Sequence, residues 1–227
     1  MVDDKKNKYL WERLHTESRF LVRYPHERLI QFVFGNFSRD KASDFKILDY
    51  GGGAGRHTVF LSENKFKTYA CDISETGLKF TEKILKEKKL KADLKIISGD
   101  KLDYPDNYFD SIVSFAVLYY LSSRQLDKII PDIYRILKKN GKIFMVLRST
   151  KDYRIKHAKL VGNGDYTIVG DKKTRVNNEN KMLMHFFSKI EIEKRFSIFK
   201  KVCIDEMVNT YDNGKIIDHD YIVQLEK

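Results

Sequence analysis

The chain has 227 residues, of which 42% are hydrophobic and 12 are glycine, a composition typical of a folded globular protein. It carries 43 Lys and Arg against 32 Asp and Glu, which gives a formal net charge of +11. This excess invites a nucleic-acid-binding interpretation, but it is spread along the whole chain without a basic tail. Such a distribution is more typical of a lysine-rich solvated surface.

Cysteine content and apolar run lengths exclude several further classes. Cys71 and Cys203 are the only cysteines, so the sequence predicts neither a disulfide framework nor a zinc cluster, and no other metal site. The first residues lack the apolar core of a signal peptide, and no apolar run is long enough to span a bilayer. We therefore expect a soluble, cytoplasmic protein with no membrane partner.

The pattern of apolar residues changes along the chain. Helical spacing at residues 5–20 and 26–37 predicts two N-terminal helices, separated at Tyr24 by the proline that follows it. From residue 46, strand-like runs alternate with helical patterns, which predicts a parallel sheet with helices on both faces. The strand-like runs are 46–50, 67–71, 94–98, 109–114 and 142–148, and the helical patterns are 55–64, 74–90 and 123–139.

The last third of the chain has different signals. Two capping-box spacings, Ser122 to Gln125 and Ser188 to Glu191, predict helix starts, and the Asn-Gly pair at 140–141 predicts the end of the first helix. Residues 197–205 and 215–226 alternate like strands around a second Asn-Gly pair, which predicts an antiparallel hairpin. Residues 149–187 are the least regular, with one strand-like run at 166–169. A long irregular segment of this kind is often functional.

A glycine-rich turn follows the first expected strand. The spacing D-x-G-x-G-x-G is formed by Asp49, Gly51, Gly53 and Gly55, with Gly52 inside it. Without Cβ atoms the backbone can turn sharply and approach a ligand closely, and the free amides at the start of the next helix add hydrogen-bond donors. The pattern therefore predicts a ligand-binding loop between a strand and a helix.

The identity of the ligand is narrowed by two further positions. A dinucleotide fingerprint needs a third glycine where this chain has Arg56, and no phosphate-loop motif is present. Asp72 ends the next strand, 21 residues after Gly51, where an acidic side chain can accept hydrogen bonds from ribose hydroxyls. These positions predict a nucleoside-containing ligand without a pyrophosphate.

The order of four sequence blocks resembles class I S-adenosylmethionine-dependent methyltransferases. The blocks are the glycine loop, the strand ending at Asp72, the segment 97–114, and the helix–turn–strand unit at 133–147. The resemblance covers residues 46–148. It implies an α/β, Rossmann-like fold with a seven-stranded, mostly parallel sheet, helices on both faces and a C-terminal antiparallel hairpin. It also implies S-adenosylmethionine as the cofactor.

The resemblance carries further site residues onto this chain. In the family, an Asp at the position of Asp100 accepts a hydrogen bond from the adenine amino group, and Lys101 and Leu102 lie beside the ring. Phe115 and Tyr120 follow the fourth strand, where aromatic rings can flank a sulfonium through cation–π attraction. The cofactor residues implied by the resemblance are Asp49, Gly51, Gly52, Gly53, Gly55, Asp72, Ile73, Asp100, Lys101, Leu102, Phe115 and Tyr120.

A weaker resemblance, to bacterial methyltransferases of surface-polysaccharide and modified-sugar pathways, covers the flanks of this core. It rests on Trp11, the segment 24–29, and the glycine and histidine pattern from Gly162 to Ser188. It implies a single domain in which residues 1–40 form a helical lid and 46–148 the cofactor-binding core. Residues 149–187 would then form an acceptor-site insertion, and 188–227 a helix and the terminal hairpin. It also implies a sugar or nucleotide-linked sugar as acceptor.

Methyl transfer needs alignment of acceptor, methyl and sulfur, and a hydroxyl acceptor also needs a base. His185 is the candidate base, with His157 as the alternative, and His57, which follows the glycine loop, is a further candidate for a role in the site. Tyr119 is a second catalytic candidate. The candidate acceptor-binding residues are Tyr24, Arg148 and Tyr166.

Several alternatives remain open at this point. A basic cluster at residues 151–159 would fit either an anionic small acceptor or a solvated face. Methylation of nucleic acid is disfavoured, because the Pro-Pro motif typical of base amine methylation is absent after residue 114 and neither cysteine is placed as a nucleophile. Two other classes are a protein that binds the cofactor without catalysis and a nicotinamide-dependent oxidoreductase. Titration with S-adenosylmethionine and NAD would distinguish these classes from a methyltransferase. The oligomeric state is left undetermined.

Overall fold

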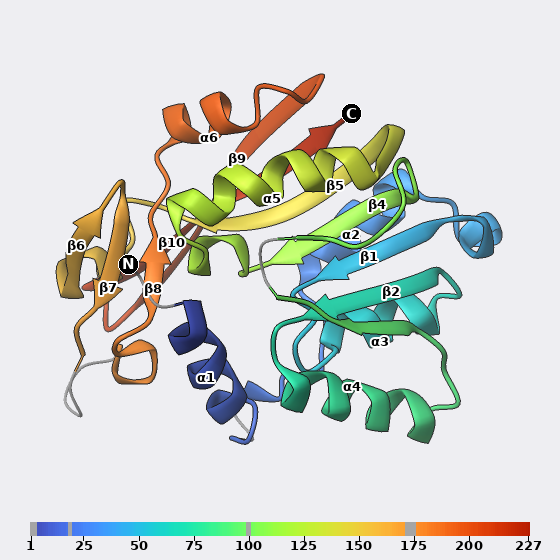
Figure 1. The fold of residues 1–227 in the computed structure, drawn as a ribbon, viewed down its shortest axis with the longest axis horizontal. Helices are drawn as coiled ribbons and strands as arrows, with labels where there is room; N and C mark the ends of the chain where they lie inside the picture. Colours follow the sequence, from blue (N-terminus) through green and yellow to red (C-terminus); the bar gives the residue numbers. More distant parts are fainter. Residues whose placement is uncertain (1–3, 18–19, 99–100, 171–175) are drawn as a thin grey trace.

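The protein is built around a seven-stranded sheet with strand order β3-β2-β1-β4-β5-β10-β9 (Figure 1). This computed structural model describes residues 4–17, 20–98, 101–170 and 176–227. The first five strands in this order are parallel, and β10 pairs antiparallel with both β5 and β9. The strands are β1 (Lys46–Tyr50), β2 (Lys67–Asp72), β3 (Asp93–Ile96), β4 (Phe109–Phe115), β5 (Leu137–Arg148), β9 (Lys201–Tyr211) and β10 (Ile216–Glu226).

Helices lie on both faces of this sheet, because its strands are apolar on both sides. Phe144 and Val146 of β5 pack with α2 and α3, whereas Met145 and Leu147 belong to the cluster that contains α5. The predicted fold class is thus confirmed. The α-helices are α1 (Asp4–Leu14), α2 (Glu27–Asn36), α3 (Arg56–Glu63), α4 (Glu75–Glu87), α5 (Ser123–Ile136) and α6 (Lys189–Arg195), with short 3-10 turns at Arg39–Asp44, Leu118–Tyr120, Tyr153–His157 and Asn177–Glu179.

The two N-terminal helices have different places. The side chain of His26 caps α2, and Leu29, Phe32 and Val33 are buried in the same cluster as β5. α1 lies apart, beside the ends of β1 and β2 (Figure 1). The expectation of two lid helices is therefore corrected: α2 is part of the core, and only α1 is placed to act as a lid.

The helix α5 begins as predicted and ends earlier. Both hydrogen bonds of the capping box between Ser122 and Gln125 are present. The helix stops at Ile136, and the Asn140-Gly141 pair lies within β5. The amide of Asn140 donates to the carbonyl of Lys227 at 3.0 Å, and the Lys227 amide donates to Gly141 at 3.1 Å. Pairing of Leu137 with Phe109 of β4, and of Asn140 and Gly141 with Lys227, thus extends β5 into residues expected to be helical.

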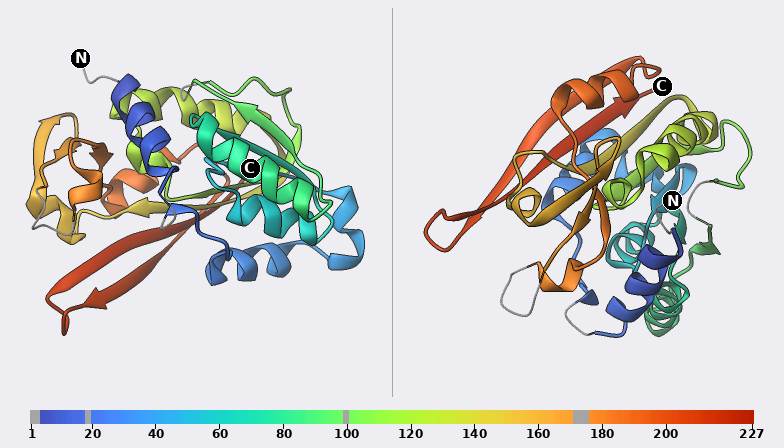
Figure 2. Two further views of the ribbon diagram at one scale, coloured as in Figure 1. Left: turned by 90° about the horizontal axis from the view of Figure 1, so that it is seen from below. Right: turned by 60° about the vertical axis from the view of Figure 1, so that its left-hand side comes forward.

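The segment 149–187 is more ordered than the sequence predicts. It forms a small antiparallel sheet of β6 (Ala158–Gly162), β7 (Asp165–Ile168) and β8 (Leu183–His185). The C-terminal hairpin is present, and its far end projects from the body of the protein (Figure 2). No helix among the described residues is long and apolar enough to cross a bilayer.

Candidate functional site

The glycine loop connects β1 to α3 and requires its glycines. Gly51, Gly53 and Gly55 all adopt positive φ, which L-amino acids with side chains rarely do. A Cβ atom added to Gly51 would overlap the side chain of Val117, and one added to Gly53 would lie 3.2 Å from Nε2 of His15. The loop therefore has no room for larger residues at these positions, in agreement with its predicted role.

Asp72 stands at the end of β2, directly beside this loop. Its Oδ2 accepts a hydrogen bond from the Gly53 amide at 2.8 Å, and its Oδ1 accepts one from the Ser74 amide at 2.8 Å. Burial raises the pKa of Asp72, while these amides and the nearby His15 oppose that shift. Ser74, not Asp72, caps α4 by accepting from the Gly77 amide at 3.1 Å. The Asp72 carboxylate lines the pocket and holds the glycine loop in place.

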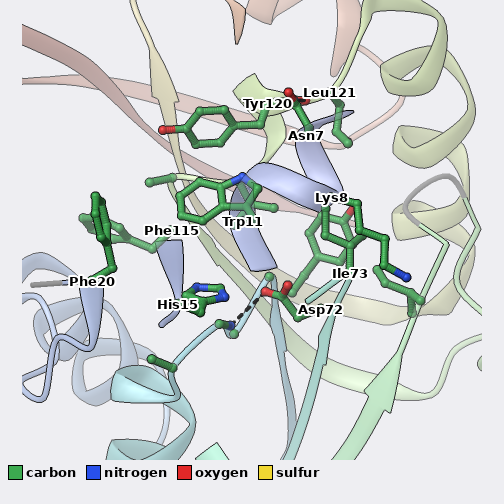
Figure 3. A pocket seen from close by; sticks show the side chains of 18 of the residues that line it. Asn7, Lys8, Trp11, His15, Phe20, Asp72, Ile73, Phe115, Tyr120 and Leu121 are labelled. Atoms are coloured by element: carbon green, nitrogen blue, oxygen red, sulfur yellow. Dashed lines mark hydrogen bonds between the residues drawn. The ribbon is translucent and has the colours of Figure 1, made fainter. Parts of the chain in front are cut away.

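A pocket of about 450 Å³ opens above the glycine loop at the carboxyl edge of the sheet (Figure 3). This volume is within the usual range for small-molecule sites. The described residues that line it are Asn7, Lys8, Trp11, His15, Phe20, Val22, Tyr50, Gly51, Gly52, Gly53, Ala54, Gly55, Arg56, Asp72, Ile73, Ile97, Ser98, Phe115, Ala116, Val117, Tyr120, Leu121, Gln125 and Leu183. Eight of the predicted cofactor residues are among them: Gly51, Gly52, Gly53, Gly55, Asp72, Ile73, Phe115 and Tyr120.

α1 and the residues just after it close one side of this pocket. Asn7, Trp11 and His15 are spaced four residues apart, so they lie on one face of the helical segment and all line the pocket. The Glu12 carboxylate accepts hydrogen bonds from the amides of Glu75 at 2.7 Å and Thr76 at 3.0 Å, the first residues of α4. The lid is therefore attached to the amino-terminal end of α4, where a negative charge is favourable.

Aromatic side chains from separate elements form the other wall. The ring of Tyr120 meets Trp11 edge to face at 5.1 Å, and its hydroxyl donates to Glu179 at 3.1 Å. The guanidinium of Arg56 lies 4.7 Å from the ring centre of Phe115 and borders the pocket. Asn7 fixes the Tyr120 backbone by donating to its carbonyl at 2.8 Å. The wall combines flat apolar surfaces with one cation.

Three other predicted cofactor residues do not line the pocket in this structure. Asp49 is buried below the loop, where it accepts a hydrogen bond from the Thr58 hydroxyl at 2.7 Å, and burial raises its pKa to about 6. Lys101 is exposed, whereas Leu102 is fully buried in the core. Asp49 supports the loop from beneath. Asp100 lies outside the described residues.

The structure places the predicted catalytic residues away from the pocket. His185 is 1% exposed, and its two ring nitrogens are each 2.8 Å from a carboxylate oxygen, of Asp165 and Glu191. Tyr119 is buried, with its hydroxyl accepting from Arg148 at 3.0 Å. His185 has no ring nitrogen left for an acceptor, so we replace its predicted catalytic role by a structural one.

The predicted acceptor residues are likewise not brought together. Tyr24 is 80% exposed, Arg148 is buried in an ion pair with Asp152 at 2.9 Å, and Tyr166 packs edge to face on Phe186. None of these three predicted residues lines the pocket. Burial of Arg148 follows from its place at the end of β5, under the small sheet.

One group of pocket residues that the sequence does not predict lies near the N-terminus. Asn7, Lys8, Trp11, His15 and Phe20 line the pocket, yet only the Trp was noted there, as part of a family resemblance. For Asn7, Trp11 and His15 the available signal was their spacing of four, which places them on one helical face. In the sequence, Arg56 marks only a departure from the dinucleotide-binding fingerprint.

Comparison with known proteins supports the resemblance to methyltransferases. Residues 47–141 match the family model described as "Methyltransferase domain". An uncharacterized protein of Rickettsia prowazekii is 24% identical over 210 residues, covering 88% of this chain and 81% of the relative. The ubiquinone biosynthesis O-methyltransferase of Pelagibacter ubique is 26% identical over 132 residues, 58% of this chain. The chain matches 54% of the length of that enzyme.

The fold has clear counterparts among solved structures. A crystal structure of a SAM-dependent methyltransferase from Methanosarcina mazei superposes with a TM-score of 0.68 at 18% identity, covering 90% of this chain and 98% of that one. At this identity the likeness concerns the fold alone. The sheet order, the glycine loop and the family match over residues 47–141 are similar to those of class I S-adenosylmethionine-dependent methyltransferases, and they indicate S-adenosylmethionine as the cofactor.

Proposed function

We propose that the pocket under α1 binds S-adenosylmethionine and that the protein transfers its methyl group to a small molecule with a flat, largely apolar body. One observation carries this proposal: a single pocket joins the glycine loop and Asp72 to the aromatic side chains of Trp11, Phe20 and Tyr120. The polar end has the chemistry to hold a nucleoside and the aromatic end the chemistry to hold a flat acceptor.

The cofactor residues follow from the pocket geometry. In the proposal, Asp72 accepts from the ribose, and the loop amides lie against the amino-acid part of the cofactor. Phe115 and Tyr120 present ring surfaces that attract a sulfonium through their quadrupoles. The glycine loop lies at the carboxyl ends of β1 and β2, where open α/β sheets bind their ligands.

Catalysis in this proposal depends on alignment. Methyl transfer from a sulfonium is an in-line displacement, so holding the acceptor atom behind the methyl group supplies a large part of the rate enhancement. The lid helix α1, attached to α4 through Glu12, would exclude water during this step. The ionisable side chains among the described lining residues are Lys8, His15, Tyr50, Arg56, Asp72 and Tyr120.

The aromatic wall also bears on the choice of acceptor. The Pelagibacter relative is named for ubiquinone biosynthesis, and a ring-bearing acceptor would fit the space between Trp11 and Phe20. Two members of the basic cluster that would fit either an anionic acceptor or a solvated face are engaged in ion pairs: Lys151 pairs with Glu206 at 2.7 Å and Arg154 with Glu179 at 2.7 Å. The sugar acceptor stays a prediction, because the aromatic side chains among the described lining residues favour a flat aromatic acceptor.

A methyltransferase assay that detects S-adenosylhomocysteine tests the proposal. The panel should contain catechols and quinols, small amines, nucleotide sugars and transfer RNA. We expect turnover with the ring compounds. Turnover only with transfer RNA or sugars would overturn the acceptor class. Parallel calorimetry with S-adenosylmethionine and NAD provides the control, because NAD binding without heat from S-adenosylmethionine would overturn the cofactor site.

A further inference from the structure

His15 occupies a place in the pocket that neither the glycine motif nor the family resemblance assigns. The residue follows α1 and is only 7% exposed. Its Nε2 lies 3.2 Å from where a Cβ of Gly53 would stand, and the Asp72 Oδ2 lies 3.9 Å from the same point. His15 and Asp72 therefore flank the same glycine of the loop (Figure 3).

A chain of hydrogen bonds fixes which ring nitrogen carries the proton. The Ser74 hydroxyl is 3.2 Å from Oε2 of Glu12 and 2.8 Å from Nδ1 of His15. The same oxygen accepts from the Gly77 amide at 3.1 Å. A hydroxyl has one proton, and an ionised carboxylate can only accept, so the Ser74 proton points to Glu12. The Nδ1 of His15 must then donate to Ser74.

This assignment leaves Nε2 of His15 as a bare acceptor. Burial lowers the pKa of His15, although Asp72 and Glu12 oppose that shift, so the ring is neutral at physiological pH. No donor to Nε2 is found among the described residues. His15 lines the pocket, and its Nε2 is not among the fully buried polar atoms that lack a partner, so a ligand or solvent group in the pocket can donate to it.

The neighbouring carboxylate indicates which ligand group this is. Each oxygen of Asp72 already accepts one backbone amide, from Gly53 or from Ser74, which leaves about one lone pair on each oxygen for a ligand. A ribose presents two hydroxyl donors side by side. A second acceptor beside Asp72 would complete the hydrogen bonding of such a diol.

We propose that His15 is a cofactor-binding residue whose Nε2 accepts a hydrogen bond from one ribose hydroxyl of S-adenosylmethionine, next to the carboxylate of Asp72. This inference rests on the proposed placement of the cofactor in the pocket. It also gives the lid a direct role, because the chain from Glu12 through Ser74 to His15 couples attachment of α1 to α4 with recognition of the nucleoside.

Calorimetry with S-adenosylhomocysteine and its 2′-deoxy and 3′-deoxy analogues tests the hydrogen bond. For the wild type, loss of the recognised hydroxyl should weaken binding about tenfold, the size of one hydrogen bond to a buried group. In His15→Phe, which keeps the ring volume, loss of the same hydroxyl should cost little. His15→Gln, whose amide oxygen can still accept, should recover much of the affinity. His157→Phe, on a partly exposed histidine away from the pocket, is the matched control.

The outcomes separate this inference from the proposed function. If the wild type binds S-adenosylhomocysteine, but both deoxy analogues lose as much affinity in His15→Phe as in the wild type, the His15 contact is wrong and the site stands. Absence of any binding by the wild type removes the site itself.

A measurement on the wild type covers the case in which His15→Phe does not fold. Nitrogen-15 NMR of the histidine-labelled protein should show His15 protonated at Nδ1, with an Nε2 signal that moves when S-adenosylhomocysteine is added. An Nε2-protonated ring, or a signal that does not respond to the ligand, would overturn the inference.

Discussion

The carboxylate of Asp72 accepts a hydrogen bond from the amide of Gly53 at 2.8 Å, which joins the end of β2 to the centre of the glycine loop. These two residues, 19 positions apart, are the two parts of the motif on which the sequence interpretation rests. The contact shows that Asp72 has two tasks: it holds the loop in its ligand-binding conformation and it presents its remaining lone pairs to the pocket.

Replacement of this carboxylate should affect both tasks. Asp72→Ala is expected to weaken S-adenosylmethionine binding by roughly 1.5–3 kcal/mol, the usual value of a hydrogen bond to a charged group. It should also lower the free energy of unfolding, because two amides lose their acceptor. Asp72→Asn keeps an acceptor for only one of the two amides, so its stability should lie between those of the wild type and Asp72→Ala, with reduced affinity. Calorimetry and chemical unfolding measure the two quantities.

The control for this series is Asp103→Ala. Asp103 is an acidic residue close in sequence to the pocket residues Ile97 and Ser98. Its side chain is 87% exposed and pairs with Lys95. Its loss should leave cofactor affinity unchanged. Equal affinities for wild type and Asp72→Ala would remove Asp72 from the binding site.

The glycine loop provides a second prediction. Gly53 has φ of +50° and lies beside His15, so Gly53→Val should strain the backbone and push a side chain into the space between the loop and the lid. We expect loss of S-adenosylmethionine binding in calorimetry. Gly35→Val is the matched control, because a side chain at Gly35 meets no atom within 4 Å. Wild-type affinity in Gly53→Val would contradict the assignment of this loop.

The sequence predicts the parallel core well because its signals are local. β1 coincides with the expected run at residues 46–50, and the glycine spacing places the loop without knowledge of any distant contact. The predicted start of β5 is wrong because residues in the first part of this strand pair with Lys227, which lies far away in the chain. β6 was missed for a different reason: most of its residues are exposed, so they show no alternation.

The candidate site was predictable only where one strand or turn defines it. Gly51 and Asp72 follow from spacing along the chain. The role of His185 does not follow from spacing. Its two partners, Asp165 and Glu191, come from a strand and a helix that only the tertiary structure brings together. The pocket face of α1 shares this limit: its spacing indicates a common face but not what that face covers.

Tyr120 allows the roles of ring and hydroxyl to be separated. Tyr120→Phe removes only the hydrogen bond to Glu179, which keeps its ion pair with Arg154, so unfolding should become easier by about 1 kcal/mol with little loss of affinity. Tyr120→Ala removes the ring that faces Trp11 and the pocket. If the ring contacts the sulfonium, this variant should lose more affinity for S-adenosylmethionine than for S-adenosylhomocysteine, whose sulfur carries no charge.

The comparison of the two ligands is the decisive measurement for Tyr120. Calorimetric titrations of both variants with both ligands give four affinities under one set of conditions. Equal losses for the charged and the uncharged ligand in Tyr120→Ala would place the ring outside contact with the sulfonium.

The buried histidine His185 should make stability depend on pH. Burial lowers its pKa, but hydrogen bonds to Asp165 and Glu191 outweigh this effect and raise the pKa above its usual value. The folded state therefore holds the proton more tightly than the unfolded chain. The resulting stabilisation is fully present below the unfolded pKa of about 6.5 and is lost as pH rises through the folded pKa.

Other groups titrate mostly at lower pH, which defines the window of the experiment. Burial lowers the pKa of His57 and of His15, and it raises those of Asp49 and Asp220 only to about 6. Between about pH 7 and 8 the change from these groups is small; at higher pH the buried Cys71 thiol, whose pKa burial raises, adds a decline because it ionises only in the unfolded chain, and this addition is common to the wild type and the variants. We expect the free energy of unfolding of the wild type to fall over this range.

His185→Gln should flatten that decline, since glutamine does not titrate, and it should also lower stability at pH 7 by removing the charge between two buried carboxylates. Chemical unfolding at several pH values from 7 to 9 measures both effects. His157→Gln, on the partly exposed histidine outside this network, should retain the slope of the wild type. A slope in His185→Gln equal to that of the wild type would mean that the pair of carboxylates does not hold a proton on His185.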